Sequence, residues 1–499
     1  MKELEFGKFE RTMQAFNETA EAVAGTLGPK GMCVLIGDPM MPNLTNDGHT
    51  VANSISYSDN FKELGAWLVK ATSSKTNDDV GDATTTTAVL LQEIVNRSLE
   101  RPENPMLIKS SLQEACKAIV EKIKAQSTPI GIEDIKKVAL ISSENEEIAT
   151  LVTDIINKVG KDGVIVVEES RTYETSSEVL EGYEAQAGFA NPVFVNDETK
   201  AKAVYDNVAV FCSQKRISSV GDIKTLFDIL QDKKIGSIVI VCEDIDDSLL
   251  GVMALTKAQG TMGILVIKTN STTLEDIAAS VGAKIVSDST GYTFQNVTTE
   301  TLGQAKKVIS SQKKTLFVAE TEEGKAHAER LKALADNNQN QFQKEELLKR
   351  VAQLTGGIGV IRIGAGADLD RGYKKDKTDD TVAAVKAALE EGIVEGGGMC
   401  LWRIAQEMTP KTVGEEILKQ ALVAPLKRIC KNAGVDYAEI VNKMPTGTGY
   451  DAKNNTYVNM LEAGIVDPAK SMRSALENST SNGSTFITTS CCIVDEAKK

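Results

Sequence analysis

A carboxylate and four hydroxyl groups occur within the seven residues Gly81–Thr87, directly before the apolar run Ala88–Leu91. This order predicts a turn that opens a helix, where unpaired backbone N–H groups and the positive end of the helix dipole favour phosphate. Asp82 would repel a bare phosphate, so its presence indicates a bound cation, most simply Mg²⁺, which bridges carboxylates to phosphate oxygens. The alternative is that Asp82 is only a helix N-cap, and this stretch alone favours that alternative.

Two earlier turns could contribute to the same site. Gly and Pro end a helical pattern at Thr26–Gly31 and expose backbone there. Asp47-Gly48 is ordinary turn chemistry, but it could also bring a second carboxylate to a shared site.

Composition excludes several classes of function. The chain has 499 residues, a net charge of −14 and 5% aromatic residues, which argues against binding nucleic acid or an anionic membrane. Only His49 and His327 are histidines, which argues against a zinc site or a histidine-based nucleophile. The eight cysteines form no Cys-x-x-Cys pair and are expected to be buried, reduced thiols. With no apolar run of membrane-spanning length and no apolar signal core, we expect a cytoplasmic protein.

The chain changes character twice, and its length suggests roughly three domains. Residues 9–126 read as mostly helical, with a short strand at Met32–Ile36. Between about 181 and 365, strand-like and helical runs alternate, which is typical of an α/β domain. Helices then return with Thr378–Glu391, and the chain closes on a predicted strand, Thr485–Val494.

In the simplest topology, the two helical ends fold together and the middle region is inserted between them. The crossings are expected near Gly182 and Gly364. The first and last strands are candidates to pair within or between chains.

Six motifs occur in the order and spacing of one family. They are Thr26–Gly31, Thr45–Gly48, Gly81–Thr86, Lys158–Gly163, Glu390–Gly398 and Gly464–Pro468. Together they make the chain, from about residue 7 to 495, similar to a group I chaperonin of the bacterial GroEL type, in a divergent form.

The resemblance implies a multidomain α and α/β chaperonin fold. A helical equatorial ATP-binding domain would comprise residues 1–125 and 391–499, a small α/β intermediate hinge domain 126–180 and 366–390, and an α/β apical client-binding domain 181–365. It also implies an ATPase that binds unfolded or partly folded proteins in the cavity of a homo-oligomeric ring, of roughly seven subunits, and assists their folding through ATP hydrolysis. A co-chaperonin lid is a further partner that the family uses.

The resemblance also assigns a nucleotide pocket. Its residues would be Thr26, Leu27, Gly28, Pro29, Asn46, Gly81, Asp82, Thr84, Thr85, Thr86, Gly397, Asp451, Ile465 and Asp467. Asp82 would hold Mg²⁺, and Thr26, Asn46 and Thr85 could hold K⁺.

Two aspartates are implied as catalytic groups. Asp47 and Asp380 would position or activate the attacking water, since phosphoryl transfer needs charge neutralisation and an in-line nucleophile. From the residues alone, Asp380 is better explained as a solvated helical charge beside Asp379, and only the family register, fixed by Glu390-Glu391-Gly392, favours the catalytic role. Asp467 could equally be a helix cap before Pro468.

Apolar positions in the middle region are implied to bind clients. They are Phe189, Val193, Phe194, Ile223, Leu226, Phe227, Leu250, Ala254 and Leu255. Several of them form stripes at helical spacing in Gly221–Asp232 and Asp247–Gln259, so the alternative is that they belong to the core of the α/β domain.

The chain departs from the family pattern at several positions. Ala83 stands where a glycine is usual, and it is strained if that position needs positive φ. Asn46 replaces a lysine, Asp451 and Lys453 replace small or amide residues, and Ala187 replaces an arginine linked to cooperativity. The family's Gly-Gly-Met tail is missing.

Other functions remain open at this stage. A ring-forming holdase or scaffold with weak or lost ATPase activity is the main alternative. A small-molecule kinase would be a compact monomer, and a group II chaperonin would carry an apical lid insertion that the sequence does not suggest.

Overall fold

A computed structural model describes residues 2–4, 9–38, 41–131, 134–160, 163–170, 172–197, 201–338 and 340–495. Lys161 and Asp162, in the fourth motif, lie outside these ranges. The chain divides into two compact units: unit 1 comprises Met1–Asn157, Val167–Ser176 and Ile361–Lys499, and unit 2 comprises Lys158–Val166 and Ser177–Val360. The chain was expected to form three domains, and its division into equatorial, intermediate and apical domains stays a prediction.

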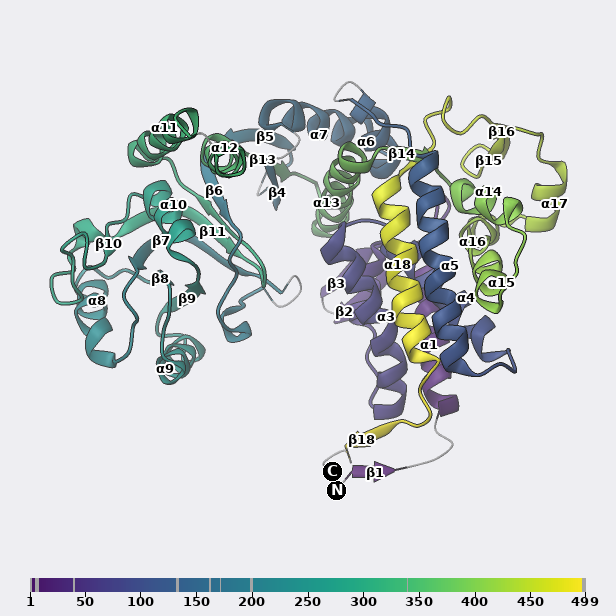
Figure 1. Ribbon diagram of the computed structural model, residues 1–499, viewed down its shortest axis with the longest axis horizontal. Coiled ribbons are helices and arrows are strands. Elements are labelled where there is room, and N and C mark those ends of the chain that lie inside the picture. The colour runs from purple at the N-terminus through teal and green to yellow at the C-terminus, as the bar shows by residue number, and fades with distance from the viewer. Residues whose placement is uncertain are drawn as a thin grey trace. The chain divides into compact units, whose positions relative to one another are not determined.

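Unit 1 is built around long helices from both ends of the chain (Figure 1). Its helices are α1 (Phe9–Ala24), α2 (Gly48–Ser54), α3 (Asn60–Asp79), α4 (Thr84–Leu99), α5 (Pro105–Gln126), α6 (Ile135–Ser143), most of α7 (Glu146–Val159), α13 (Asp368–Glu391), α14 (Met399–Glu407), α15 (Val413–Ala421), α16 (Ala424–Asn432), α17 (Tyr437–Lys443) and α18 (Ala469–Phe486). Among these described helices, none is long and apolar enough to span a membrane.

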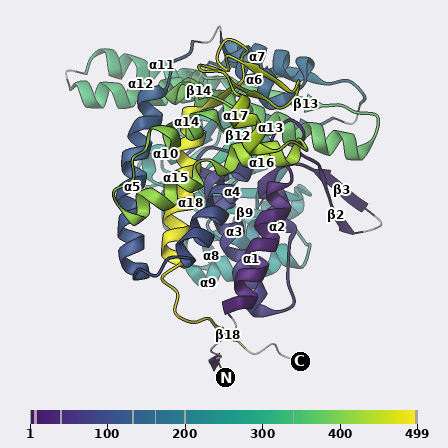
Figure 2. The same ribbon diagram turned by 90° about the vertical axis from the view of Figure 1, so that its right-hand side faces the viewer.

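The last helix, α18, packs along α4 and α5, as both ribbon views show (Figures 1 and 2). Small residues make this close packing possible: a Cβ on Gly483 would lie 3.2 Å from Leu91 Cδ1. The predicted strand Thr485–Val494 is therefore wrong in its first part, because α18 continues to Phe486, whose ring stacks on Phe9 and Phe16. Only Ile493–Asp495 forms a strand, β18, which pairs antiparallel with β1 (Lys2–Leu4) of the same chain.

Short antiparallel strand pairs complete unit 1. Two are hairpins, β2 (Val34–Asp38) with β3 (Met41–Thr45) and β15 (Gly449–Asp451) with β16 (Thr456–Val458), and the third joins strands remote in sequence, β14 (Ile393–Glu395) with β17 (Val466–Pro468). The strand expected at Met32–Ile36 thus begins two residues later and has a hairpin partner. That partner was missed because Pro42 and the polar Asn43 interrupt its pattern.

Unit 2 is an α/β domain around one mixed sheet. The strand order is β6 (Gly182–Ala185), β12 (Thr315–Val318), β11 (Gly303–Ser310), β7 (Ala203–Ser213), β8 (Ser237–Cys242) and β9 (Gly263–Lys268), with β10 (Ile285–Val286) also pairing with β7. The helices are α8 (Val220–Asp232), α9 (Asp247–Ala258), α10 (Ser271–Val281), α11 (Glu322–Asp336) and α12 (Gln341–Thr355).

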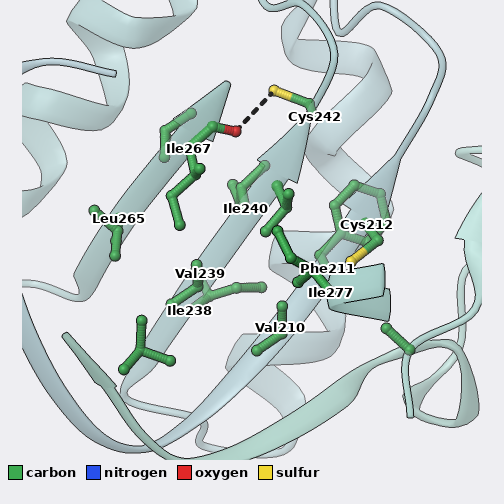
Figure 3. Packing of buried hydrophobic residues seen from close by; sticks show 14 of the residues in the cluster. Val210, Phe211, Cys212, Ile238, Val239, Ile240, Cys242, Leu265, Ile267 and Ile277 are labelled. Carbon is green, nitrogen blue, oxygen red and sulfur yellow. Dashed lines mark hydrogen bonds between the residues drawn. The ribbon is translucent and has the colours of Figure 1, made fainter. Parts of the chain in front are cut away.

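The centre of this sheet is largely apolar. β7, β8 and β9 run parallel, and most side chains of Val208–Ser213, β8 and β9 are buried on both faces, as expected when helices cover a parallel sheet, whereas Asp206 and Asn207 of β7 are exposed. Figure 3 shows this packing, with the thiol of Cys242 directed at the carbonyl oxygen of Ile267 at 3.9 Å.

The chain crosses between the units through β4 (Val164–Glu169), β5 (Ser176–Leu180) and β13 (Ile358–Ile363), which form a sheet in the order β4-β13-β5. The glycines expected at the crossings are sterically required. A Cβ on Gly182 would lie 2.5 Å from the carbonyl oxygen of Phe317, and one on Gly364 would lie 2.4 Å from that of Glu174.

Candidate functional site

Unit 1 contains a cavity of about 680 Å³, within the usual range for a bound small molecule or nucleotide. Its walls come from the turn after α1, the β3–α2 and α3–α4 turns, α6, α13, the turn after β14, and the strands β15 to β17. The predicted residues on these walls are Thr26, Leu27, Gly28, Pro29, Asn46, Asp47, Asp82, Thr84, Thr85, Thr86, Asp380, Gly397, Asp451, Ile465 and Asp467. Gly81, the remaining predicted pocket residue, is not on the wall.

The N-terminus of α4 opens into this cavity. The N-cap is Ala83, with φ 60° and ψ 22°, and it provides no side-chain hydrogen bond to the helix. The interpretation of Asp82 as a plain helix cap is therefore wrong. Since the cap supplies no acceptor, the first N–H groups of the helix are left for an anion in the cavity.

Asp47 has a fixed orientation beside this terminus. Its carboxylate caps α2, accepting hydrogen bonds from the backbone N–H of His49 at 3.2 Å and of Thr50 at 2.8 Å. The hydroxyls of Thr50 and Thr84 also donate to it, at 2.6 and 3.4 Å. The two turns approach closely because residue 48 is glycine: a Cβ there would lie 2.5 Å from Thr85 Oγ1.

A pair of hydroxyls joins the first turn to α4. The Oγ1 atoms of Thr26 and Thr85 lie 3.2 Å apart, and Thr26 donates its proton to the carbonyl oxygen of Val23 at 2.9 Å. Thr85 must then be the donor within the pair, which leaves lone pairs on both oxygens near the cavity.

Asp380 reaches the cavity from α13, far along the chain from Asp82. The helix packs against α6, β3, α18 and β17, all in unit 1, and Lys377 lines the cavity one turn before Asp380. The helix begins at Asp368, ten residues before the predicted Thr378, because its first turns are charged and lack an apolar stripe.

The carboxylates of the cavity repel one another. Burial, followed by the charges of Asp47 and Asp82, raises the pKa of Asp380 well above its ordinary value. Burial also raises the pKa of Asp82, and burial with the charge of Asp82 raises the pKa of Asp467 to about 7. Such crowding of acids away from water is typical of a site that takes up a cation.

Gly397, Ile465 and Asp467 also line the cavity. Asp467 lies in β17, and the N-cap of α18 is Pro468, so the helix-cap interpretation of Asp467 is wrong. Asp451 is turned toward its own hairpin: its carboxylate accepts from the N–H groups of Lys453 and Asn454 at 2.9 and 3.2 Å and from Asn454 Nδ2 at 2.7 Å.

A comparison with family models identifies the chain. The model of the TCP-1/cpn60 chaperonin family matches residues 19–497. The chain belongs to the TCP-1/cpn60 chaperonin family. This confirms the chaperonin resemblance inferred from the six motifs.

Solved structures support the same fold for this chaperonin. Two crystal forms of the chaperonin gp146 from the bacteriophage EL 2 (Pseudomonas aeruginosa), both in the presence of ATP-BeFx, match it over 99% of each chain. The identities are 19% and 20%, with TM-scores of 0.67 and 0.63. The predicted multidomain α and α/β chaperonin fold is thereby confirmed.

The donor set of the cavity suits Mg²⁺ held together with a nucleotide. Among the described His, Cys, Asp and Glu side chains, no three are grouped closely enough to hold a metal by themselves. Mg²⁺ is commonly bound through one or two carboxylates plus substrate phosphates, and Asp82 beside the N-terminus of α4 provides that combination.

The nine predicted client-binding residues of unit 2 do not form one surface. Phe194, Ile223, Leu226 and Leu250 are buried in the core of the α/β domain, because their stripes face the sheet. Phe189 and Phe227 are partly buried against that core, and Ala254 is half-buried. Val193 and Leu255 are exposed, the latter by 65%.

The cavity also has a wall that sequence reasoning missed. It is formed by α6 and its C-cap, through Val138, Leu140, Ile141, Ser142 and Glu144, and it faces Lys377 of α13. One signal in the sequence could have identified Lys377 as a cavity residue. Lys377 and Asp380 are three residues apart, so they share a face of the helix.

Proposed function

We propose that this chaperonin hydrolyses ATP in the cavity of unit 1 and uses the cycle to bind and release non-native proteins. The observation that carries the proposal is the convergence of Asp47, Asp82 and Asp380 with the open N-terminus of α4 on one cavity of nucleotide size. The phage chaperonin of the same fold was crystallised in the presence of ATP-BeFx, which supports a nucleotide as the ligand.

Each residue has a distinct role in this proposal. Asp82 would hold Mg²⁺, and the backbone N–H groups of Thr84 to Thr86, with the hydroxyl of Thr86, would bind phosphate oxygens. Thr26, Thr85 and the backbone of Asn46 would hold K⁺. When bound, Mg²⁺ neutralises charge on the phosphates and on the leaving group.

The attacking water would be oriented by two carboxylates. Asp47 is held rigidly by its four hydrogen bonds, and the carboxylate of Asp380, which lines the same cavity, would accept the proton of that water. Gly397 and Asp467 would contact the ribose, and Ile465 would contact the base. The carboxylate of Asp451 would stabilise the β15–β16 hairpin and would not contact the base of the nucleotide.

For the client, we retain only the apolar side chains that a partner can reach. Val193, Val252 and Leu255 are exposed on η2 (Pro192–Phe194) and α9. Exposed apolar area binds unfolded chains without sequence preference. The ring, its subunit number and a co-chaperonin remain part of the proposal, as does the division of unit 1 into equatorial and intermediate domains.

The test is steady-state release of phosphate from Mg-ATP by the purified full chain and by Asp380→Ala. We expect the variant to be slower by about 10²–10⁴-fold, the usual contribution of a general base. Asp379→Ala, which removes the neighbouring charge outside the cavity, should retain most of the activity. Equal rates for the wild type and Asp380→Ala would reject the ATPase and favour a holdase or scaffold.

A further inference from the structure

The cavity of unit 1 has a large excess of negative charge. Its described lining residues include six acidic side chains and two lysines; the acids are Asp47, Asp82, Glu144, Asp380, Asp451 and Asp467, and the lysines are Lys377 and Lys453. The polyphosphate of ATP would add further negative charge, and one Mg²⁺ with one K⁺ would neutralise only part of the total. A cationic side chain next to the phosphates would therefore favour binding.

Lys377 is in the better place of the two lysines. Lys453 is exposed in the turn between β15 and β16, whereas the Lys377 side chain is only 13% exposed. Lys377 precedes Asp380 by one helical turn, so both project from the same face of α13. Its positive charge also opposes the effect of burial on the pKa of Asp82 and of Asp380, so it acts on both carboxylates.

The present partner of Lys377 can be released readily. Lys377 Nζ lies 3.2 Å from Glu144 Oε1, and the glutamate side chain is 42% exposed. Glu144 is the C-cap of α6 and has a left-handed backbone, with φ 54°. Because Glu144 can be solvated by water once the pair opens, a second anion in the cavity can compete for the ammonium group.

We propose that Lys377 is a phosphate-binding residue of this site and that its ammonium group moves from Glu144 to the terminal phosphate when ATP binds. This inference rests on the proposed function. ADP lacks the terminal phosphate, so Lys377 would remain paired with Glu144 in the ADP state. The exchange would thus distinguish the two nucleotides and alter the contact between α13 and α6.

The test is equilibrium binding, by titration calorimetry, of Mg-ADP and of a non-hydrolysable Mg-ATP analogue to the full chain. Lys377→Met should weaken binding of the analogue by about tenfold or more, the effect of one charged hydrogen bond, and leave ADP affinity within about twofold. Lys377→Arg should retain the preference for the analogue. Glu144→Gln should tighten the analogue several-fold, because the ammonium no longer has to leave a carboxylate.

Lys375→Met is the matched control. It removes the same charge from the same helix, but Lys375 pairs with Glu169 at 3.6 Å and does not line the cavity. Its affinities for both nucleotides should equal those of the wild type.

Different failures have different meanings. If the wild type binds neither nucleotide, the proposed function fails and this inference with it. If the wild type binds both, but Lys377→Met weakens both equally, Lys377 is only a tether to Glu144 and the inference alone is overturned. If Lys377→Met does not fold, Glu144→Gln decides: tighter binding of the analogue supports the exchange, and unchanged or weaker binding refutes it.

Discussion

The two units bury carboxylates in opposite ways. In unit 2, the Asp276 side chain is 2% exposed and accepts hydrogen bonds from Arg350 Nε at 2.9 Å, Arg350 Nη2 at 2.6 Å and His327 Nε2 at 2.8 Å. Burial alone would raise its pKa, but the hydrogen bonds from His327 and Arg350 and their charges lower the pKa below its ordinary value. In unit 1, Asp380 faces other carboxylates, and its pKa is raised well above the ordinary value.

This difference distinguishes a buried carboxylate that stabilises the fold from buried carboxylates that form a ligand site. A buried acid that serves the fold carries its counter-charges within the chain, and losing them would be costly. The acids of the cavity are left undercompensated, as expected where a site is built to receive a cation and a ligand at the expense of local stability.

The largest expected effect is on the stability of unit 2. Asp276→Ala leaves Arg350 and His327, which are only partly exposed, without their acceptor, so the free energy of unfolding should fall by about 3–5 kcal/mol. Asp380→Ala should leave the stability of unit 1 unchanged or raise it, since repulsion is relieved. Hydrogen exchange of backbone amides would measure the stability of each unit separately, with β8 reporting on unit 2 and α4 on unit 1.

An exposed acid provides the control for this contrast. Asp244 pairs with Arg216 at 3.1 Å with both side chains largely exposed, so Asp244→Ala should cost less than about 1 kcal/mol. Equal losses from Asp276→Ala and Asp380→Ala would contradict the distinction between the units.

The pH dependence of stability should have opposite signs in the two units. The pKa of Asp467 is raised to about 7 in the folded state, so this group makes unit 1 less stable as pH rises from about 4 to about 7, by up to about 1.4 kcal/mol per pH unit. Asp276 has a lowered pKa; its contribution to unit 2 is present above the ordinary value near 4 and is lost as pH falls below it.

Asp467→Asn should remove the loss of stability between about pH 4 and pH 7. Denaturant unfolding at several pH values, with signals assigned to each unit, would measure this. A variant with the same pH profile as the wild type would show that Asp467 does not carry the effect.

The smallest expected effect concerns backbone strain at the cavity. Ala83 has φ 60°, a conformation that costs a non-glycine residue roughly 1–2 kcal/mol. Ala83→Gly should therefore stabilise unit 1 by about 1 kcal/mol. Ala118→Gly, at an exposed position inside α5, should instead destabilise by about 1 kcal/mol; the same sign for both would argue against strain at Ala83.

Local signals were sufficient for several helices. The mostly helical character predicted for residues 9–126 includes α4 and α5, and the start of α5 has local signals, since Asn104 caps it and Pro105 occupies its first turn. Helix α18 was predicted to end too early, because its Ser- and Thr-rich end has weak helix propensity and is held by packing against α4 and by Phe486.

The candidate site was anticipated from motifs, but its far wall was not. Turns such as Gly81–Thr86 are recognised from a local sequence motif. The contact of α6 with α13 joins helices remote in sequence and depends on tertiary packing. The prediction that Ile223 and Leu226 bind clients was wrong for a related reason. Periodicity shows that the two residues share a helix face, but it does not show whether that face contacts the core or a partner.

The most direct test of the central claim is a structure of the full chain with Mg²⁺ and ATP–beryllium fluoride. The account predicts the phosphates at the N-terminus of α4, the metal on Asp82, and the Asp380 carboxylate on the opposite side of the terminal phosphate position. A nucleotide bound elsewhere, or an Asp380 carboxylate remote from Asp82 with the nucleotide in place, would contradict it.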